Sequence, residues 1–211
     1  MRSKQLHSIW VGVLFLGLLS SAAFATPEED MANAEKSFNE EDIKESARFL
    51  RLAAAQNYFP AQVRLGELMD RSEEPEEAFG WFFTAAFQGD AAGQYQVALM
   101  YGIGSGVQKS PEKALYWAKK SAEQDYLASV QLLSSAYSGA TDKNGNKVAT
   151  KNIFDAQPNK EQADFWSAKL PKLEEAAKKN ERQALARAKK RAEEAEKANK
   201  EKSKLLCGLK C

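Results

Sequence analysis

Small and apolar residues recur along the chain at the spacing of amphipathic helices, most clearly in residues 89–124. Within this stretch, residues 89–101 and 111–124 each place such side chains three, four and seven positions apart, which predicts two helices. We expect the first helix to end at Tyr101. Because glycines favour positive φ after a helix, three of them should form the turn: Gly102, Gly104 and Gly106.

The same pattern precedes and follows this stretch, so the chain is internally repetitive. Residues 57–88 form a shorter unit, and residues 125–171 form a third unit with a long polar loop at 138–158. Loops of that length are usually functional or disordered. Each helix pair has one apolar face, which it can bury only against its neighbours. We expect small residues to allow close helix approach and tryptophans to fill the gaps between layers. The positions that carry the repeat are Ala61, Leu65, Gly66, Trp81, Tyr101, Gly104, Gly106, Ala114, Trp117, Tyr137 and Trp166.

The first 25 residues have the pattern of a secretory signal peptide. Arg2 and Lys4 precede an apolar run at 9–19, and residues 23–25 form a small-x-small cleavage site. The run is too short for a comfortable membrane span, although an uncleaved anchor is the alternative. We therefore expect a soluble exported protein that begins near Thr26 and lies in an oxidising compartment.

Charge divides the predicted mature chain into an acidic body and a basic tail. Residues 26–171 have a net charge of −7, whereas residues 172–211 have a net charge of +6. The tail is rich in Ala, Glu, Lys and Arg, which predicts a long helix with one of two roles, a solvated face or a docking strip. Residues 26–56 are acidic and carry a degenerate copy of the repeat. The charge asymmetry indicates an electrostatic choice of partner.

Candidate chemistry is sparse. The only histidine, His7, lies in the leader, so the mature chain lacks histidine triads and nearly all kinds of zinc site. We expect a protein that is not an enzyme and has no cofactor or metal, with a carboxylate-only glycosidase as the remaining enzymatic alternative. An Asp/Asn/Gly cluster at 142–146 allows a calcium hypothesis but lacks a closing glutamate.

The only two cysteines, Cys207 and Cys211, lie at the end of the chain. An oxidising compartment favours a disulfide, and Gly208 would ease the bend of a bridge within the chain. A bridge between chains and free thiols are the alternatives.

The unit at 89–124 resembles the Sel-like repeat (SLR), a relative of the tetratricopeptide repeat. The similarity rests on its glycine loop, its small helix residues and Trp117, and it extends over about residues 30–170. The resemblance implies an all-α fold, a right-handed α-solenoid followed by the charged C-terminal helix at 172–211. It also implies a concave surface for protein partners. By analogy with tetratricopeptide geometry, the exposed candidates for partner contact on the first helices are Glu67, Asp70, Tyr95 and Gln131.

The overall layout resembles the MotX family of the sodium-driven polar flagellar motor. The shared features are a signal peptide, a few Sel-like repeats, a charged C-terminal helix and a terminal cysteine pair. The resemblance implies a periplasmic stator-assembly component, required for rotation, located near the outer membrane. Its partners would be a MotY-like ring protein and a PomB-like stator subunit, with homo-oligomers possible within a ring and no nucleic acid bound. A general exported adaptor or periplasmic regulator is the alternative.

Overall fold

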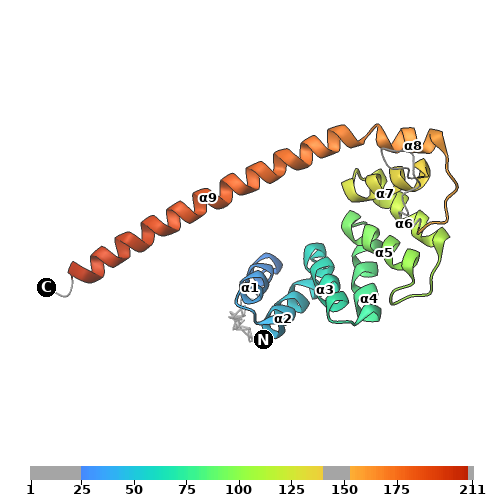
Figure 1. Ribbon diagram of the computed structural model, residues 1–211. Coiled ribbons are helices and arrows are strands. Elements are labelled where there is room, and N and C mark those ends of the chain that lie inside the picture. The colour runs from blue at the N-terminus through green and yellow to red at the C-terminus, as the bar shows by residue number, and fades with distance from the viewer. Residues whose placement is uncertain (1–24, 140–152, 209–211) are drawn as a thin grey trace, which may run out of the picture.

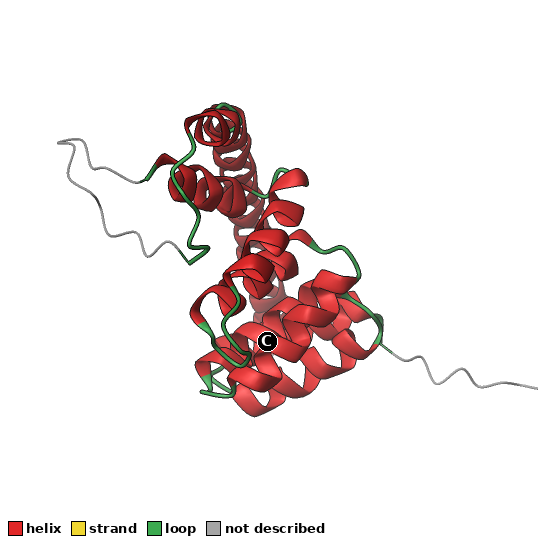
Figure 2. Cartoon of the chain, turned by 90° about the vertical axis from the view of Figure 1, so that its right-hand side faces the viewer, coloured by secondary structure: helices red, strands yellow, loops and turns green. Residues whose placement is uncertain are grey.

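The computed structural model describes residues 25–139 and 153–208, with side chains as far as Glu201. Helices joined by short loops make up this part of the chain, and it contains no strand (Figures 1 and 2). The predicted all-α class is therefore confirmed. The helices are α1 (Pro27–Asn39), α2 (Ile43–Ala55), α3 (Phe59–Arg71), α4 (Pro75–Phe87), α5 (Ala91–Ile103), α6 (Pro111–Glu123), α7 (Leu127–Ser138), α8 (Lys160–Ser167) and α9 (Leu170–Gly208).

Helices α1 to α8 stack in sequence order as four antiparallel pairs, so that each helix packs on the ones before and after it. The stack forms an arc, and α9 leaves its far end and runs back across it (Figure 1). Each of α1 to α6 has 13 residues, as a repeat of one structural unit requires. The predicted solenoid is confirmed, and it continues through α1 and α2, the pair formed by the degenerate copy.

Small residues bring neighbouring helices into close contact. A Cβ added to Gly66 would lie 2.6 Å from the Phe82 ring, and one added to Gly93 would lie 2.8 Å from the Cβ of Ala85. These two glycines let α3 approach α4 and α4 approach α5. Fully buried side chains fill the centre of the stack, among them Ala53, Ala61, Leu65, Ala78, Val97, Ala114 and Leu133.

The three repeated tryptophans do not share one environment. Trp166 is buried, whereas Trp81 and Trp117 are only partly buried at the edge of the core. Trp81 Nε1 instead donates a hydrogen bond of 3.1 Å to a Glu77 carboxylate oxygen, and this bond is the main cause that lowers the pKa of Glu77. The expectation that tryptophans fill the gaps between layers is therefore right for Trp166 alone. The interior position of α4 belongs to the neighbouring residue, Phe82.

The glycine turn differs from its expected form. Helix α5 continues to Ile103, so Gly102 lies inside it rather than in the turn. Position 102 requires a glycine, because a Cβ there would lie 2.7 Å from the Ile153 side chain. Gly104 ends the helix with φ 79°, and Gly106 follows with φ 63°.

The long third loop returns to the core at its end. Ile153 and Phe154 are buried, and the backbone N–H of Asn159 donates a 2.9 Å hydrogen bond to the carbonyl of Tyr137. The loop at 138–158 was expected to be functional or disordered, and these two apolar residues near its end instead pack into the core beside α5. The calcium hypothesis at 142–146, and the predicted leader at 1–25 except for its last residue, lie outside the described residues.

Glutamine side chains, two of them buried, join successive repeats. Gln88 and Gln124 follow the last residues of α4 and α6, and their amides donate to the side-chain oxygens of Gln62 and Gln94 at 3.4 and 2.8 Å. Gln62 and Gln94 in turn donate to carbonyls of the preceding repeat, those of Ala54 and Ala86. Each glutamine pair thus links the two helices of one repeat to the end of the repeat before it.

Candidate protein-binding surfaces

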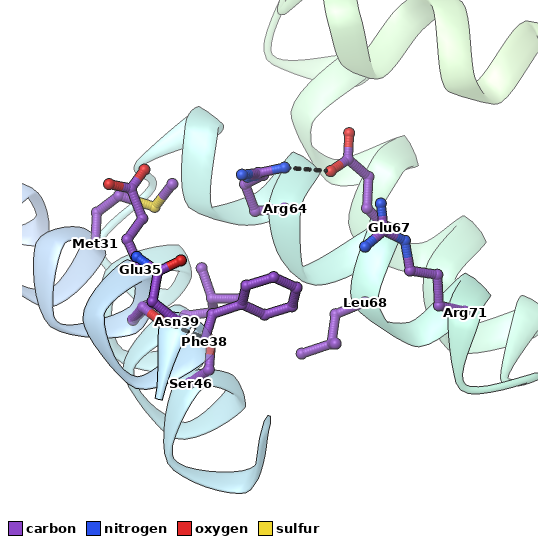
Figure 3. A pocket seen from close by; sticks show the side chains of 11 residues that line it. Met31, Glu35, Phe38, Asn39, Ser46, Arg64, Glu67, Leu68 and Arg71 are labelled. Atoms are coloured by element: carbon purple, nitrogen blue, oxygen red, sulfur yellow. Dashed lines mark hydrogen bonds and ion pairs between the residues drawn. The ribbon is translucent and has the colours of Figure 1, made fainter. Parts of the chain in front are cut away.

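A groove opens between α1, α2 and α3, and we call it the α1–α3 groove. Its cavity measures about 490 Å³. Phe38 points from α1 toward Leu68 of α3, and the charged side chains stand along the walls (Figure 3). Met31, Ala34, Glu35, Phe38, Asn39, Ser46, Leu50, Arg64, Glu67, Leu68 and Arg71 line the cavity.

The groove has an apolar floor and a charged rim. Phe38 is 44% exposed, so its ring is available to a ligand, while Leu50 and Leu68 are buried beneath. On the rim, Arg64 pairs with Glu67 at 3.0 Å. Glu35 has no ion-pair partner within the described part of the chain. An apolar side chain flanked by charges matches these features.

A second surface lies on α4 and α6, where aromatic rings contact one another in a row. Between ring centres, Phe83 lies 5.6 Å from Phe79, 6.3 Å from Phe87 and 5.8 Å from Trp117. The Tyr116 ring centre lies 5.3 Å from that of Trp117. We call these five residues the aromatic row. Phe87 is 78% exposed and Tyr116 55% exposed. Large exposed apolar clusters mark interaction sites, and aromatic residues are enriched at protein interfaces.

Lysines border the aromatic row and its neighbours. The Lys120 ammonium lies 5.9 Å from the centre of the Tyr116 ring, and that of Lys113 lies 5.1 Å from the Tyr101 ring. An ammonium over an aromatic face is a favourable contact. The border gives this surface a basic edge as well as an apolar centre.

The four residues predicted for partner contact lie on first helices but do not form one site. Glu67 lines the α1–α3 groove, whereas Asp70 is exposed on α3 outside that lining. Gln131 is exposed on α7. Tyr95, expected to be exposed, is half-buried because its ring packs on Tyr126 at 5.6 Å.

Tyr95 and Tyr126 form a packed pair between α5 and the start of α7. Burial raises the pKa of both phenols, and the pKa of Tyr126 is raised further by Tyr95, Asp90 and Glu67. These groups therefore lie within electrostatic reach along the first helices. Both phenols stay neutral donors at physiological pH, since an ordinary tyrosine titrates near pH 10.

Helix α9 forms an arm that projects from the repeats. Leu170 and Leu173 pack against the core, and every residue from Glu175 to Glu201 is exposed. Lys169 precedes the arm and donates a 2.7 Å hydrogen bond to Asp125, between α6 and α7. This ion pair ties the start of the arm to the second and third repeats. The side chains of Cys207 and Cys211 lie outside the described residues, so the disulfide hypothesis stays a prediction.

Neither a metal cluster nor a membrane span occurs in the part of the chain that the structure describes. No three histidine, cysteine, aspartate or glutamate side chains gather there in a way that could hold a metal ion. Across residues 25–139 and 153–208, no helix is both long and apolar enough to traverse a bilayer.

Comparison with known families agrees with the repeat geometry. The Sel1 repeat family model matches residues 40–58, 60–90 and 91–126. Over these three segments the chain is similar to the Sel1 repeat. Stacked helical repeats of this kind present extended surfaces that suit protein partners. The first matched segment includes α2, so the similarity extends into the degenerate copy at 26–56.

Solved structures share the fold. The crystal structure of a Sel1 repeat protein from Oxalobacter formigenes superposes with a TM-score of 0.57 at 22% identity, over 68% of this chain and 56% of that one. The crystal structure of c5321, a protective antigen present in uropathogenic Escherichia coli strains with an SLR fold, gives 0.55 at 23% identity, over 69% and 30%. At these identities the similarity shows the fold alone. The chain spans little more than half of the first protein and under a third of the second, and no curated protein matches it.

Sequence reasoning missed the aromatic row and the floor of the α1–α3 groove. Phe79, Phe83 and Phe87 are spaced four residues apart, which was a visible signal for one helix face. The groove had no such signal, because it depends on how α1 sits against α3.

Proposed function

We propose that this protein is a non-catalytic, exported protein-binding component that docks a partner through the aromatic row. The observation that carries the proposal is the exposure of Phe87 and Tyr116 at the two ends of a continuous aromatic cluster. Aromatic side chains, tryptophan and tyrosine above all, are typical energetic centres of protein interfaces. The Sel1 repeats supply the rigid stack that holds the rings in place.

At the finer level, the proposed place of action is the periplasm, within the sodium-driven polar flagellar motor. The protein would be required there for stator assembly and rotation, with a MotY-like ring protein and a PomB-like stator subunit as partners. Support comes from the layout of the sequence, which combines a predicted signal peptide, repeats, a basic C-terminal helix and a terminal cysteine pair. A general exported adaptor or periplasmic regulator is the competing function.

A genetic test separates the two functions. Deletion of the gene should abolish swimming while the filaments remain intact if the protein belongs to the motor. A regulator of another process would leave swimming unchanged, and that outcome would reject the motor assignment.

A biochemical test addresses the surface. Affinity capture from periplasmic extract, with and without reductant, should recover the ring and stator proteins with the full-length chain. The double variant Phe87→Ala/Tyr116→Ala should lose them, whereas Leu52→Ala should retain them. Leu52 is a suitable control because it is 44% exposed on α2, outside the aromatic row. Equal capture by all three proteins would show that the row is not the docking surface.

A further inference from the structure

The acidic and basic residues of the chain gather in different parts of its fold. Residues 26–77, which contain α1 to α3 and the start of α4, have a net charge of −8. Residues 178–191 of α9 have a net charge of +6, with seven basic side chains and one acidic. All fourteen are exposed. The long-range field therefore favours contact between the arm and the first two repeats.

One face of the arm carries a leucine among cations. Lys178, Arg182, Leu185 and Lys189 are spaced four, three and four residues apart, which places them on one side of a helix. Leu185 is 71% exposed, and it is the one large apolar side chain that is exposed on the part of α9 with described side chains. Lys178 and Arg182 form no ion pair with any residue that the structure describes. Lys189 pairs with Glu193 at 4.0 Å, so this face presents an exposed leucine beside two unpaired cations and one paired cation.

The α1–α3 groove has the matching features. Phe38, Leu50 and Leu68 provide an apolar floor, and Glu35 and Glu67 stand on the walls contributed by α1 and α3. A helix that lays an apolar side chain into a groove between charged walls is a common recognition mode. The lining also holds two cations, Arg71 and Arg64, and Arg64 is paired with Glu67 at 3.0 Å. The attraction for a basic helix therefore comes from the net charge of −8 of the surrounding residues 26–77.

The arm cannot reach the groove of its own chain. It is one continuous helix of 39 residues, about 58 Å long at 1.5 Å per residue. Its first turns are fixed on the core by Leu170 and Leu173, at the end of the stack opposite to α1 (Figure 1). From there α9 extends away past α1 as a straight rod. To enter that groove, α9 would have to give up the contacts of Leu170 and Leu173 with the core or break as a helix.

We propose that the α1–α3 groove receives helix α9 of a second copy of this chain. Leu185 of one copy lies on Phe38 and Leu68 of the other, and Lys178, Arg182 and Lys189 face Glu35 and Glu67. The contact joins two different surfaces, so it links copies head to tail and closes into rings or extends into chains, depending on the rotation between copies. The inference is independent of the aromatic row and of the flagellar assignment.

A charge-swap experiment on the full mature chain tests this contact. The groove variant is Glu35→Lys/Glu67→Lys, and the arm variant is Lys178→Glu/Arg182→Glu/Lys189→Glu. All five positions are exposed or partly exposed, so folding should be retained, and circular dichroism with thermal melting verifies it. Sedimentation velocity is run with reductant present, so that cysteine bridges do not contribute, at about 0.1 M and about 1 M salt.

The wild type should associate with rising concentration at low salt, and the association should weaken at high salt. Each variant alone should lose at least tenfold in apparent association constant, because its arm and groove then carry like charges. An equimolar mixture should regain association, since each arm then meets a groove of opposite charge. Leu185→Ala should also lose association without any change of charge.

Three outcomes would overturn the inference. The wild type could remain monomeric at all concentrations. The variants could associate as well as the wild type. The mixture could also fail to recover, in which case the arm binds a different acidic partner. Capture of the partner through the aromatic row would be unaffected in each case, so failure here is distinguishable from failure of the proposed function.

Discussion

The side-chain amide of Gln124 donates a 2.8 Å hydrogen bond to the side-chain oxygen of Gln94, and the side-chain amide of Gln94 donates one of 3.3 Å to the carbonyl of Ala86. One buried side chain thereby connects α6, α5 and the end of α4. Gln88 and Gln62 repeat the arrangement one unit earlier. In the third unit Val130 is buried at the position equivalent to Gln94, and the row of glutamines stops there.

Replacing Gln94 with alanine should destabilise the repeats by about 1–3 kcal/mol, because it removes two hydrogen bonds, the buried one to the Ala86 carbonyl and the one from the Gln124 amide. Urea unfolding followed by circular dichroism measures the effect. Gln131→Ala removes the same group from an exposed position and should change stability by less than about 0.5 kcal/mol. Equal losses for both variants would contradict a special role for the buried row.

Gly106 should tolerate no side chain. Its φ is 63°, and an added Cβ would lie 2.0 Å from the Pro75 carbonyl oxygen, which is backbone and cannot move aside cheaply. Gly106→Ala should therefore cost about 3 kcal/mol or more. The measurement is the urea midpoint, compared with that of the matched variant below.

Gly80→Ala is the matched variant, because the same added methyl meets nothing within 4 Å in the middle of α4. Alanine is the better helix former, so this variant should gain about 0.5–1 kcal/mol. A loss at Gly80, or a gain at Gly106, would show that the close approach of the glycine turn to α4 is not as described.

These two glycines also show what a sequence can and cannot predict. Periodicity and repeat spacing were sufficient for the helix pairs, the solenoid and the turn glycines Gly104 and Gly106, because those features depend on neighbours along the chain. Gly102 was misplaced, since its small size is required by Ile153, some fifty residues further on in a polar segment. Contacts between distant segments leave no local pattern.

The binding surfaces also combine features that depend on neighbours along the chain with contacts between distant segments. The spacing of Phe79, Phe83 and Phe87 is local, whereas the meeting of Phe83 with Trp117 depends on how α4 and α6 pack. Tyr95 was expected to be exposed because the partner that half-buries it, Tyr126, belongs to the next unit. Whether a side chain of a repeat protein is exposed depends on its contacts with the neighbouring repeat. The sequence pattern within one repeat therefore does not predict it.

The link between Asp125 and Lys169 should give the protein a pH dependence that Asp125→Asn removes. The hydrogen bond from Lys169 is the main cause that lowers the pKa of Asp125 below its ordinary value. A carboxylate with a lowered folded pKa stabilises the fold above its unfolded pKa, near 3.9, and loses that contribution as pH falls through the folded value. Asn suits this position, because Asp125 has φ 58° and Asn accepts that backbone.

Urea unfolding from pH 7 down to the acid limit of the fold tests this dependence. The wild type should be slightly more stable than Asp125→Asn at neutral pH, and the two should converge below about pH 4. Asp164→Asn is the control, because Asp164 pairs with Lys160 within α8 and does not touch the arm. A difference that grew toward low pH would contradict the assigned cause.

Removal of the arm should leave the repeats intact. The sequence alone had indicated a cut at Pro171, but Leu173 packs against the core, so the cut belongs after Glu175. All described side chains beyond that residue are exposed, and alanine supplies most apolar positions, so the lost helix contributes little buried area. The free energy of unfolding from urea titration should therefore stay within about 0.5 kcal/mol of that of the full chain, while the helical signal falls in proportion to the residues removed.

A chain cut after Pro171 is the comparison, and it should be less stable because it also loses Leu173. If both truncations lowered the midpoint equally and strongly, the arm would have to pack on the repeats along its length, which its exposure contradicts.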